Sequence, residues 1–181
     1  MTEAAPSVLF LNGTVGVGKT TVADAVGALL AERGIPHAVI DLDALRRGWP
    51  SPEGDRFNNA IELTNLRSVA ANYRAAGAQV LVLAGVLEEV AAIDDYRDAL
   101  GGVTPTIIRL TVDPREGERR LRARHRADGD GDGDTAELSW HLARHGELDG
   151  VLDAAAIPGP VIDTTARDAR AIALEVLQTA G

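Results

Sequence analysis

The chain has 181 residues, of which 45% are hydrophobic and 3% aromatic, and its 18 basic and 27 acidic side chains give a net charge of −9. This length suits one domain with an aliphatic core, and the net charge disfavours nucleic acids and anionic membranes as partners. Because the sequence contains no cysteine, it excludes disulfides, thiolate metal sites and thiol catalysis.

Apolar runs alternate along the chain with segments of helical period, which is typical of an α/β protein whose parallel strands are buried on both faces. We predict five strands, at residues 7–11, 37–40, 79–86, 106–112 and 161–162. The predicted helices are 19–33, 57–76, 88–100, 113–125, 135–145 and 166–180. No stretch has the pattern of a signal peptide or the length of a membrane span, so we expect a cytoplasmic protein.

Residues 13–20 match the phosphate-binding pattern G-x-x-x-x-G-K-[ST] at every fixed position, directly after a predicted strand and before a predicted helix. Glycines let successive backbone N–H groups converge on phosphate oxygens, and the helix N-terminus favours the same negative charge. Lys19 would reach the β- and γ-phosphates of ATP, and the Thr20 hydroxyl would ligate Mg²⁺. The predicted nucleotide-binding residues here are Gly13, Thr14, Val15, Gly16, Val17, Gly18, Lys19, Thr20 and Thr21.

The third predicted strand lacks the acidic residue that larger P-loop NTPases use beside their metal ion. Its apolar run, 80–83, continues into Ala84 and Gly85 where an aspartate would be expected. Glu88 and Glu89 follow, and we interpret them as the acidic first turn of a solvated helix. A catalytic carboxylate is therefore expected elsewhere.

Asp41 and Asp43 follow the second predicted strand, at the edge where open α/β sheets bind ligands. A carboxylate there could accept a proton from a substrate hydroxyl or hold a water on Mg²⁺. The alternative is that one of them caps a helical turn that begins at Ala44. Arg46 follows Asp43 by three residues, which places both on one side of such a turn.

With the P-loop, the segment 41–48 makes the chain resemble small kinases of the adenylylsulfate-kinase and chloramphenicol-phosphotransferase kind, within the nucleoside-monophosphate-kinase-like group. The resemblance implies a three-layer α/β/α sandwich of the P-loop NTPase class. It would have a five-stranded parallel sheet, one domain spanning residues 1–181, and a helical lid at about 115–135. It also implies that Asp43 is the catalytic base and that Arg46 contacts the substrate. The substrate-binding candidates are Asp41, Asp43, Arg46, Asn65 and Arg67, the last two from a segment similar to the adenylylsulfate-kinase substrate helix.

Five arginines lie close together in this otherwise acidic chain: Arg119, Arg120, Arg122, Arg124 and Arg126. Such a run is usually a solvated helix face, but here it falls where this kinase group has its lid. Arg120 and Arg124 are one helical turn apart and share a face. By resemblance, Arg120 would stack near adenine and Arg124 would reach the phosphates. The turn at Thr164 would contact adenine through its backbone.

Three further features have simpler interpretations. The alternating Asp-Gly run at 128–134 lacks the final glutamate of a calcium loop and is interpreted as a flexible lid tip. His141 and His145 share a helix face but lack the adjacent glutamate of a zinc motif, so we interpret them as solvated. Thr165 would cap the last helix. Three aromatic side chains would either line an acceptor pocket or pack in the core: Trp49, Phe57 and Tyr73.

These features predict an ATP- and Mg²⁺-dependent phosphotransferase that acts on a hydroxyl of a small metabolite, nucleotide-like compound or antibiotic. Lys19, Asp43 and Arg124 would be catalytic. The alternative is an ATP-binding hydrolase or sensor that acts through a protein partner. We expect a monomer or homodimer that binds neither nucleic acid nor membranes.

Overall fold

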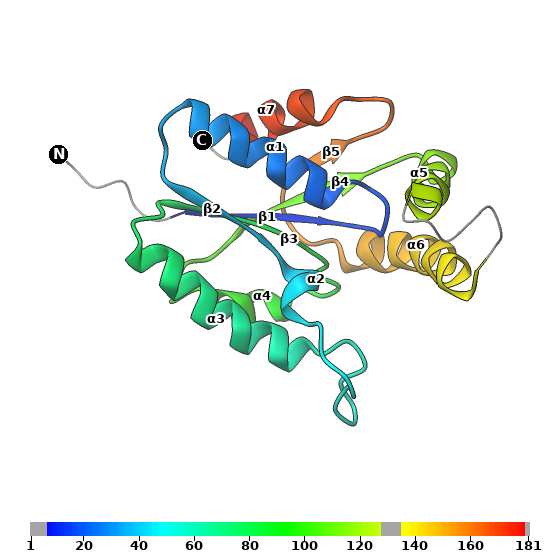
Figure 1. The fold of residues 1–181 in the computed structure, drawn as a ribbon, viewed down its shortest axis with the longest axis horizontal. Coiled ribbons are helices and arrows are strands. Elements are labelled where there is room, and N and C mark those ends of the chain that lie inside the picture. Colours follow the sequence, from blue (N-terminus) through cyan, green and yellow to red (C-terminus); the bar gives the residue numbers. More distant parts are fainter. Residues whose placement is uncertain (1–6, 128–134, 180–181) are drawn as a thin grey trace.

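The computed structural model describes residues 7–127 and 135–179. Five parallel strands form one sheet in the order β2-β3-β1-β4-β5, with β1 at its centre (Figure 1). The strands are β1 (Ser7–Gly13), β2 (His37–Asp41), β3 (Val80–Gly85), β4 (Thr106–Thr111) and β5 (Val161–Asp163). Each predicted strand is present, and every strand end lies within two residues of the prediction.

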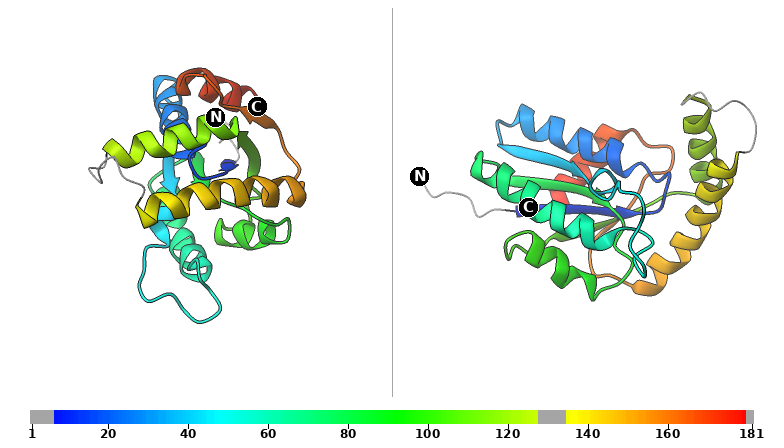
Figure 2. Two further views of the ribbon diagram at one scale, coloured as in Figure 1. Left: turned by 90° about the vertical axis from the view of Figure 1, so that its right-hand side faces the viewer. Right: turned by 60° about the horizontal axis from the view of Figure 1, so that its bottom comes forward.

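Helices cover both faces of the sheet (Figure 1). On one face lie α1 (Lys19–Glu32) and α7 (Ala169–Thr179), and on the other α3 (Asn59–Ala75) and α4 (Ala92–Ala99). A short helix, α2 (Leu42–Leu45), follows β2 directly. Beyond the carboxyl end of β1, α5 (Pro114–Ala127) and α6 (Ala136–Ala155) lie side by side (Figure 2). The predicted three-layer α/β/α sandwich is confirmed.

The core is aliphatic and divided by the sheet into two clusters. Successive side chains of β1 point to opposite faces, so Leu9 and Leu11 are buried beneath α1 and α7. Val8 and Phe10 are buried on the side of α3 and α4, where the Phe10 ring meets Tyr96 edge to face at 5.1 Å between centroids. Burying both faces of β1 fixes the central strand, and thereby the start of the phosphate loop that follows it.

Two helices differ most from the prediction in their boundaries. The helix expected at 88–100 begins at Ala92, so Glu88 and Glu89 belong to the loop after β3 and not to a first helical turn. The helix expected at 135–145 continues to Ala155, because Gly146 and Gly150 are accommodated within it. Isolated glycines lower helix propensity without ending a helix when neighbouring positions, such as Leu148 here, are buried.

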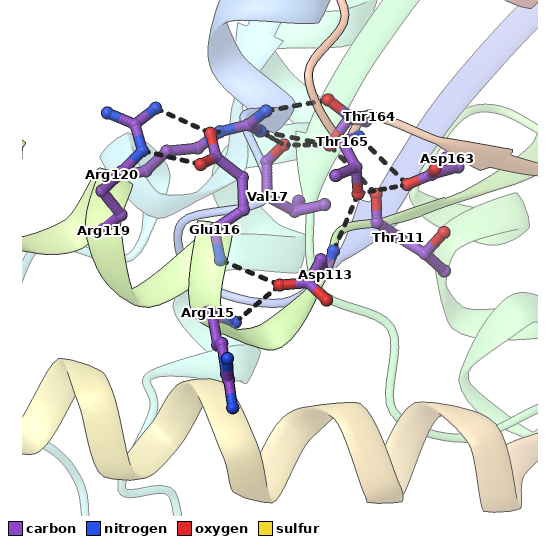
Figure 3. Close-up of polar contacts among 10 residues, drawn as sticks. All are labelled: Val17, Thr111, Asp113, Arg115, Glu116, Arg119, Arg120, Asp163, Thr164 and Thr165. Atoms are coloured by element: carbon purple, nitrogen blue, oxygen red, sulfur yellow. Dashed lines mark hydrogen bonds and ion pairs between the residues drawn. The ribbon is translucent and has the colours of Figure 1, made fainter.

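The cap of the last helix also differs from the prediction. The Asp168 carboxylate accepts a hydrogen bond from the Ala171 amide at 2.9 Å and so caps α7. The Thr165 hydroxyl instead donates to the Asp163 carboxylate at 2.7 Å and accepts from the Asp113 amide at 2.8 Å (Figure 3). Asp113 itself caps α5 by accepting from the amides of Arg115 and Glu116. The predicted Asp-Gly tip at 128–134 lies outside the described residues.

No helix in the described ranges 7–127 and 135–179 combines the length and hydropathy that crossing a membrane requires.

Replacing Gly85 with alanine is expected to destabilise the fold by about 1–3 kcal/mol. A Cβ at this position would lie 2.5 Å from Cδ1 and 3.1 Å from Cβ of the buried Leu42, so α2 would have to move. Gly146→Ala is the matched control, because a Cβ there meets nothing within 4 Å and helix propensity improves by up to about 1 kcal/mol. Urea denaturation measures both. Equal stability of the two variants would contradict the packing at Gly85.

Candidate active site

The phosphate loop, residues 13–20, connects β1 to α1 and has the conformation expected of an anion site. Gly16 and Gly18 have φ angles of 84° and 98°, which residues with a Cβ rarely adopt. Across the described residues, the amides of Gly16 and Gly18 donate to no protein group. Lys19 folds back over the loop, where Nζ donates to the carbonyls of Gly13 at 3.0 Å and Thr14 at 2.9 Å. The loop therefore has free amide donors for phosphate oxygens.

Lys19 is the sole lysine in the sequence and is almost fully buried. The pKa of its ammonium group is lowered from 10.5 to about 8, mainly by burial, and the positive charges of Arg124 and Arg109 contribute to this lowering. The negative charges of Asp43 and Asp41 act in the opposite direction. The fold thus brings the predicted Lys19, Asp41, Asp43 and Arg124 within electrostatic reach of one another.

Because there is one lysine, its titration can be observed without assignment. We expect a single ¹³Cε-lysine NMR resonance that titrates near pH 8 in the folded chain and near 10.5 when the chain is unfolded. Phosphate charges favour the ammonium form, so ADP should raise the Lys19 pKa, and ADP affinity should fall as the pH rises above about 8. A folded-state titration near 10.5 that ADP leaves unchanged would contradict the buried placement of Lys19.

Asp41 joins the end of β2 to the phosphate loop. Its Oδ2 accepts a hydrogen bond from the Thr20 hydroxyl at 3.0 Å, and its Oδ1 accepts from the Asp43 amide at 2.9 Å, which caps α2. Asp41 is therefore the carboxylate that caps the helical turn, which begins at Leu42 and not at the predicted Ala44, whereas Asp43 lies in the first turn of α2 with an exposed side chain. The Thr20 hydroxyl and the Asp41 carboxylate are hard oxygen ligands, and Mg²⁺ bound with a nucleotide commonly uses only one or two protein ligands. This pair fits such a metal.

Arg46 is charge-paired within the protein. Its Nη2 forms an ion pair with Glu62, a carboxylate that is 1% exposed and that also accepts a hydrogen bond from the Tyr96 hydroxyl. Burial raises the pKa of Glu62, while the Tyr96 hydrogen bond and the Arg46 charge oppose that rise. The Nε of Arg46 lies 3.7 Å from Oδ1 of Asp43. The predicted Asp43–Arg46 proximity is present, but the guanidinium is also paired with Glu62 of α3.

A polar stripe at the start of α3 fixes the segment after Asp43. Asn58 donates to the carbonyls of Arg46 at 2.8 Å and Gly48 at 3.1 Å, and Asn65 donates to that of Leu45 at 2.8 Å. Asn58, Glu62 and Asn65 have the spacing i, i+4 and i+7 that is typical of one helix face. This polar pattern can be recognised in the sequence. Asn65 thus supports the α2 turn and does not line the cavity, and the exposed Arg67 does not line it either.

A cavity of about 900 Å³ opens between the phosphate loop, α2 and the α5–α6 pair. Besides the phosphate loop, its lining includes Asp43, Arg46, Arg120 and Arg124. Phe57 lines it too, whereas Trp49 is 94% exposed and Tyr73 is 43% exposed, outside both core and cavity. Of the three aromatic candidates, only Phe57 is therefore placed to meet an acceptor.

The wall of the cavity opposite the phosphate loop includes residues that the sequence did not single out. Arg144 of α6 forms an ion pair with Glu88, and its guanidinium lies 5.0 Å from the centroid of the Phe57 ring. Glu88 is held in this position by a buried two-way bridge, in which the Asn12 side chain donates to the Leu87 carbonyl and accepts from the Leu87 amide, each at 3.0 Å. Trp140, whose side chain is 43% exposed, also lines the cavity.

Arg120 is engaged by protein groups on several sides (Figure 3). Its Nε donates to Glu116 at 2.9 Å, and its Nη1 and Nη2 donate to the hydroxyl and carbonyl of Thr164 at 3.1 and 2.8 Å. Arg119 and Arg120 hold the pKa of Glu116 down to about 2 through these hydrogen bonds. Arg124 lines the cavity, and within the described residues its guanidinium makes no hydrogen bond or ion pair. Of the arginine run, Arg124 is thus placed to receive a phosphate, while Arg120 joins α5 to the turn after β5.

Comparison with known protein families gives one match over most of the chain. The family model that matches is described as an AAA domain, and it covers residues 8–148. Among curated proteins, none matches this chain.

Several solved structures share the fold, among them those of two proteins named as kinases. The tunicamycin resistance protein of Deinococcus radiodurans is 20% identical, with a TM-score of 0.61 over 97% of this chain and 96% of that chain. The APS kinase of Mycobacterium tuberculosis, solved with AMPPNP and APS, is 23% identical, with a TM-score of 0.56 over 97% of each chain. Shikimate kinase from Acinetobacter baumannii, solved with shikimate, is 20% identical, with a TM-score of 0.55 over 97% and 93% of the two chains.

Proposed function

The chain belongs to the AAA domain family, and from this premise we propose that it is an ATP-dependent phosphotransferase acting on a hydroxyl group of a small molecule. The observation that carries the proposal is that Lys19, Thr20 and Asp43 line one cavity of about 900 Å³, with Asp41 hydrogen-bonded to the Thr20 hydroxyl beside it. The net charge of −9 supports a small-molecule acceptor over a nucleic acid.

The proposed reaction uses Asp43 as the base. Its carboxylate accepts the proton of the acceptor hydroxyl while the hydroxyl oxygen attacks the γ-phosphorus. A bond forms between that oxygen and phosphorus, the bond from phosphorus to the β–γ bridging oxygen breaks, and ADP leaves with the electron pair. Lys19 and Arg124 stabilise the negative charge on the transferring group. Asp43 later releases its proton to solvent.

Thr20 and Asp41 would hold Mg²⁺, which when bound neutralises charge on the β- and γ-phosphates of the donor. With the metal assigned to Asp41, Asp43 remains free to serve the acceptor. Arg46 keeps this arrangement through its ion pair with Glu62. Arg47 lines the cavity, is exposed, and has no ionic partner among the described residues. We assign it to bind an anionic part of the acceptor.

The proposal can be tested with γ-labelled ATP. The experiment measures in parallel how much label is released as inorganic phosphate and how much appears in a phosphorylated product. The α5–α6 pair shields the cavity from water, so we expect slow hydrolysis without an acceptor and rapid transfer with the right one. The alternative function, an ATP hydrolase or sensor, predicts rapid phosphate release that no acceptor changes. A hydrolysis rate unaffected by a broad panel of hydroxyl compounds would favour that alternative.

A further inference from the structure

Two carbonyl groups of the phosphate loop, those of Val15 and Val17, accept hydrogen bonds from side chains outside the loop. In a trans peptide the C=O of one residue and the N–H of the next point in opposite directions. A donor that holds the carbonyl of Val15 or Val17 on the outside of the loop therefore turns the amide of Gly16 or Gly18 to the inside. Those two amides donate to no protein group in the described part of the chain, as an anion site requires.

His145 of α6 holds the first of these carbonyls. Its side chain is 3% exposed, so the prediction that it is solvated is wrong. Its Nδ1 lies 2.7 Å from the Val15 carbonyl, and because a carbonyl only accepts, Nδ1 is the donor. Gly117 of α5 makes room for the ring, since a Cβ there would lie 2.5 Å from Cε1 of His145. The ring is thus enclosed by α5, α6 and the phosphate loop.

Arg120 of α5 holds the second carbonyl (Figure 3). Its Nη1 donates to the Val17 carbonyl at 3.1 Å. The Thr164 hydroxyl also lies 3.1 Å from this carbonyl, but its single proton is shared with the Thr111 carbonyl at 3.0 Å. Arg120 is therefore the main donor to the Val17 carbonyl. Glu116 accepts a hydrogen bond from the Arg120 Nε and so holds the Arg120 guanidinium in place.

We propose that α5 and α6 set the phosphate loop for binding, with His145 as a positioning residue that turns the Gly16 amide toward the phosphates and Arg120 doing the same for Gly18. This rests on the proposed nucleotide site and adds a physical link from the two helices to the affinity for phosphate. The contribution of His145 is specific to phosphate, because His145 contacts the loop and not the turn at Thr164 expected to meet adenine, whereas Arg120 contacts both.

Calorimetric affinities for ADP and for adenosine test the link on the whole chain. His145→Leu removes the donor and keeps an apolar side chain, and we expect ADP to bind about five- to tenfold more weakly while adenosine changes by less than about twofold. His145→Asn places an amide donor near the Nδ1 position and should restore ADP affinity to within about threefold of the unmodified chain.

His37→Leu is the matched control. His37 Nδ1 also donates to a backbone carbonyl, that of Ile35 at 2.8 Å, at the opposite end of the sheet. This variant should bind ADP as the unmodified chain does. Should His145→Leu fail to fold by circular dichroism, His145→Asn compared with His145→Ala keeps the same test, with Asn expected to bind ADP more tightly.

Two results would overturn the link: ADP affinity that is unchanged without the donor, or equal losses for ADP and adenosine. Unmodified chain that binds no ADP would overturn both this link and the proposed function. Tight ADP binding with no phosphoryl transfer to any acceptor would sink the proposed function alone, and the ratio of ADP to adenosine affinities would still decide the role of His145.

Discussion

Asp43→Asn is expected to lower kcat for phosphoryl transfer by about 10²–10⁴, the range that a positioned general base contributes. Asparagine keeps the size of the side chain and cannot accept the acceptor's proton. The ATP affinity and the Mg²⁺ concentration at half-maximal rate should stay the same, because Asp41, not Asp43, bonds to Thr20. Steady-state kinetics at varied ATP, acceptor and Mg²⁺ concentrations measure all three quantities.

Asp41→Asn is the matched comparison at the end of the same strand. It weakens the oxygen pair formed with Thr20, so the Mg²⁺ requirement should rise severalfold while high Mg²⁺ restores much of the rate. The opposite result would identify Asp41 as the catalytic base. In that case Asp43→Asn would keep full activity, and Asp41→Asn would lose activity that high Mg²⁺ does not restore. Full activity in both variants would show that neither carboxylate accepts the proton of the acceptor hydroxyl.

Lys19→Met is expected to lower kcat by about 10²–10³ and to weaken ATP binding as well, because the charge that meets the transferring phosphoryl group is lost. Methionine keeps an unbranched apolar side chain in a position that is almost fully buried, so the fold should persist. Removing an ammonium whose pKa burial already lowers to about 8 also relieves a desolvation cost. Transfer kinetics and the unfolding free energy together measure the outcome.

The comparison variant for Lys19→Met is Arg170→Met. Arg170 is an exposed cation on α7 that pairs with Glu32 at 2.7 Å, far from the phosphate loop. It tests whether loss of any positive charge slows transfer. A similar loss of activity in both variants, or none in Lys19→Met, would contradict the role assigned to Lys19.

Local patterns were enough to predict the layers of the fold and the phosphate loop. Buried runs such as 80–83 and the glycine spacing of 13–20 depend on neighbouring residues in sequence, so they can be recognised without contacts from distant elements. Asp41 is intermediate, because its strand-end position indicated a cap or a metal role but only the fold brings it to Thr20.

The residues that were misjudged or missed depend on long-range contacts. His145 reaches a carbonyl 130 positions earlier in the chain, and Glu88 meets a side chain 56 positions later. A histidine on a polar helix is usually solvated, and only the packing of α6 against Gly117 and the phosphate loop buries this one. The pairing of Arg46 with Glu62 likewise follows from how α3 packs against α2.

The most direct test of the central claim follows the label of γ-labelled ATP in the presence of Mg²⁺ and a broad panel of hydroxyl-bearing metabolites and antibiotics. We expect the label to move to an organic acceptor, ADP to form in equal amount, and Asp43→Asn to slow the transfer by about 10²–10⁴ while still binding ATP. Label that appears only as inorganic phosphate, or that stays on tightly bound ATP with every acceptor, would contradict the proposed phosphotransferase activity.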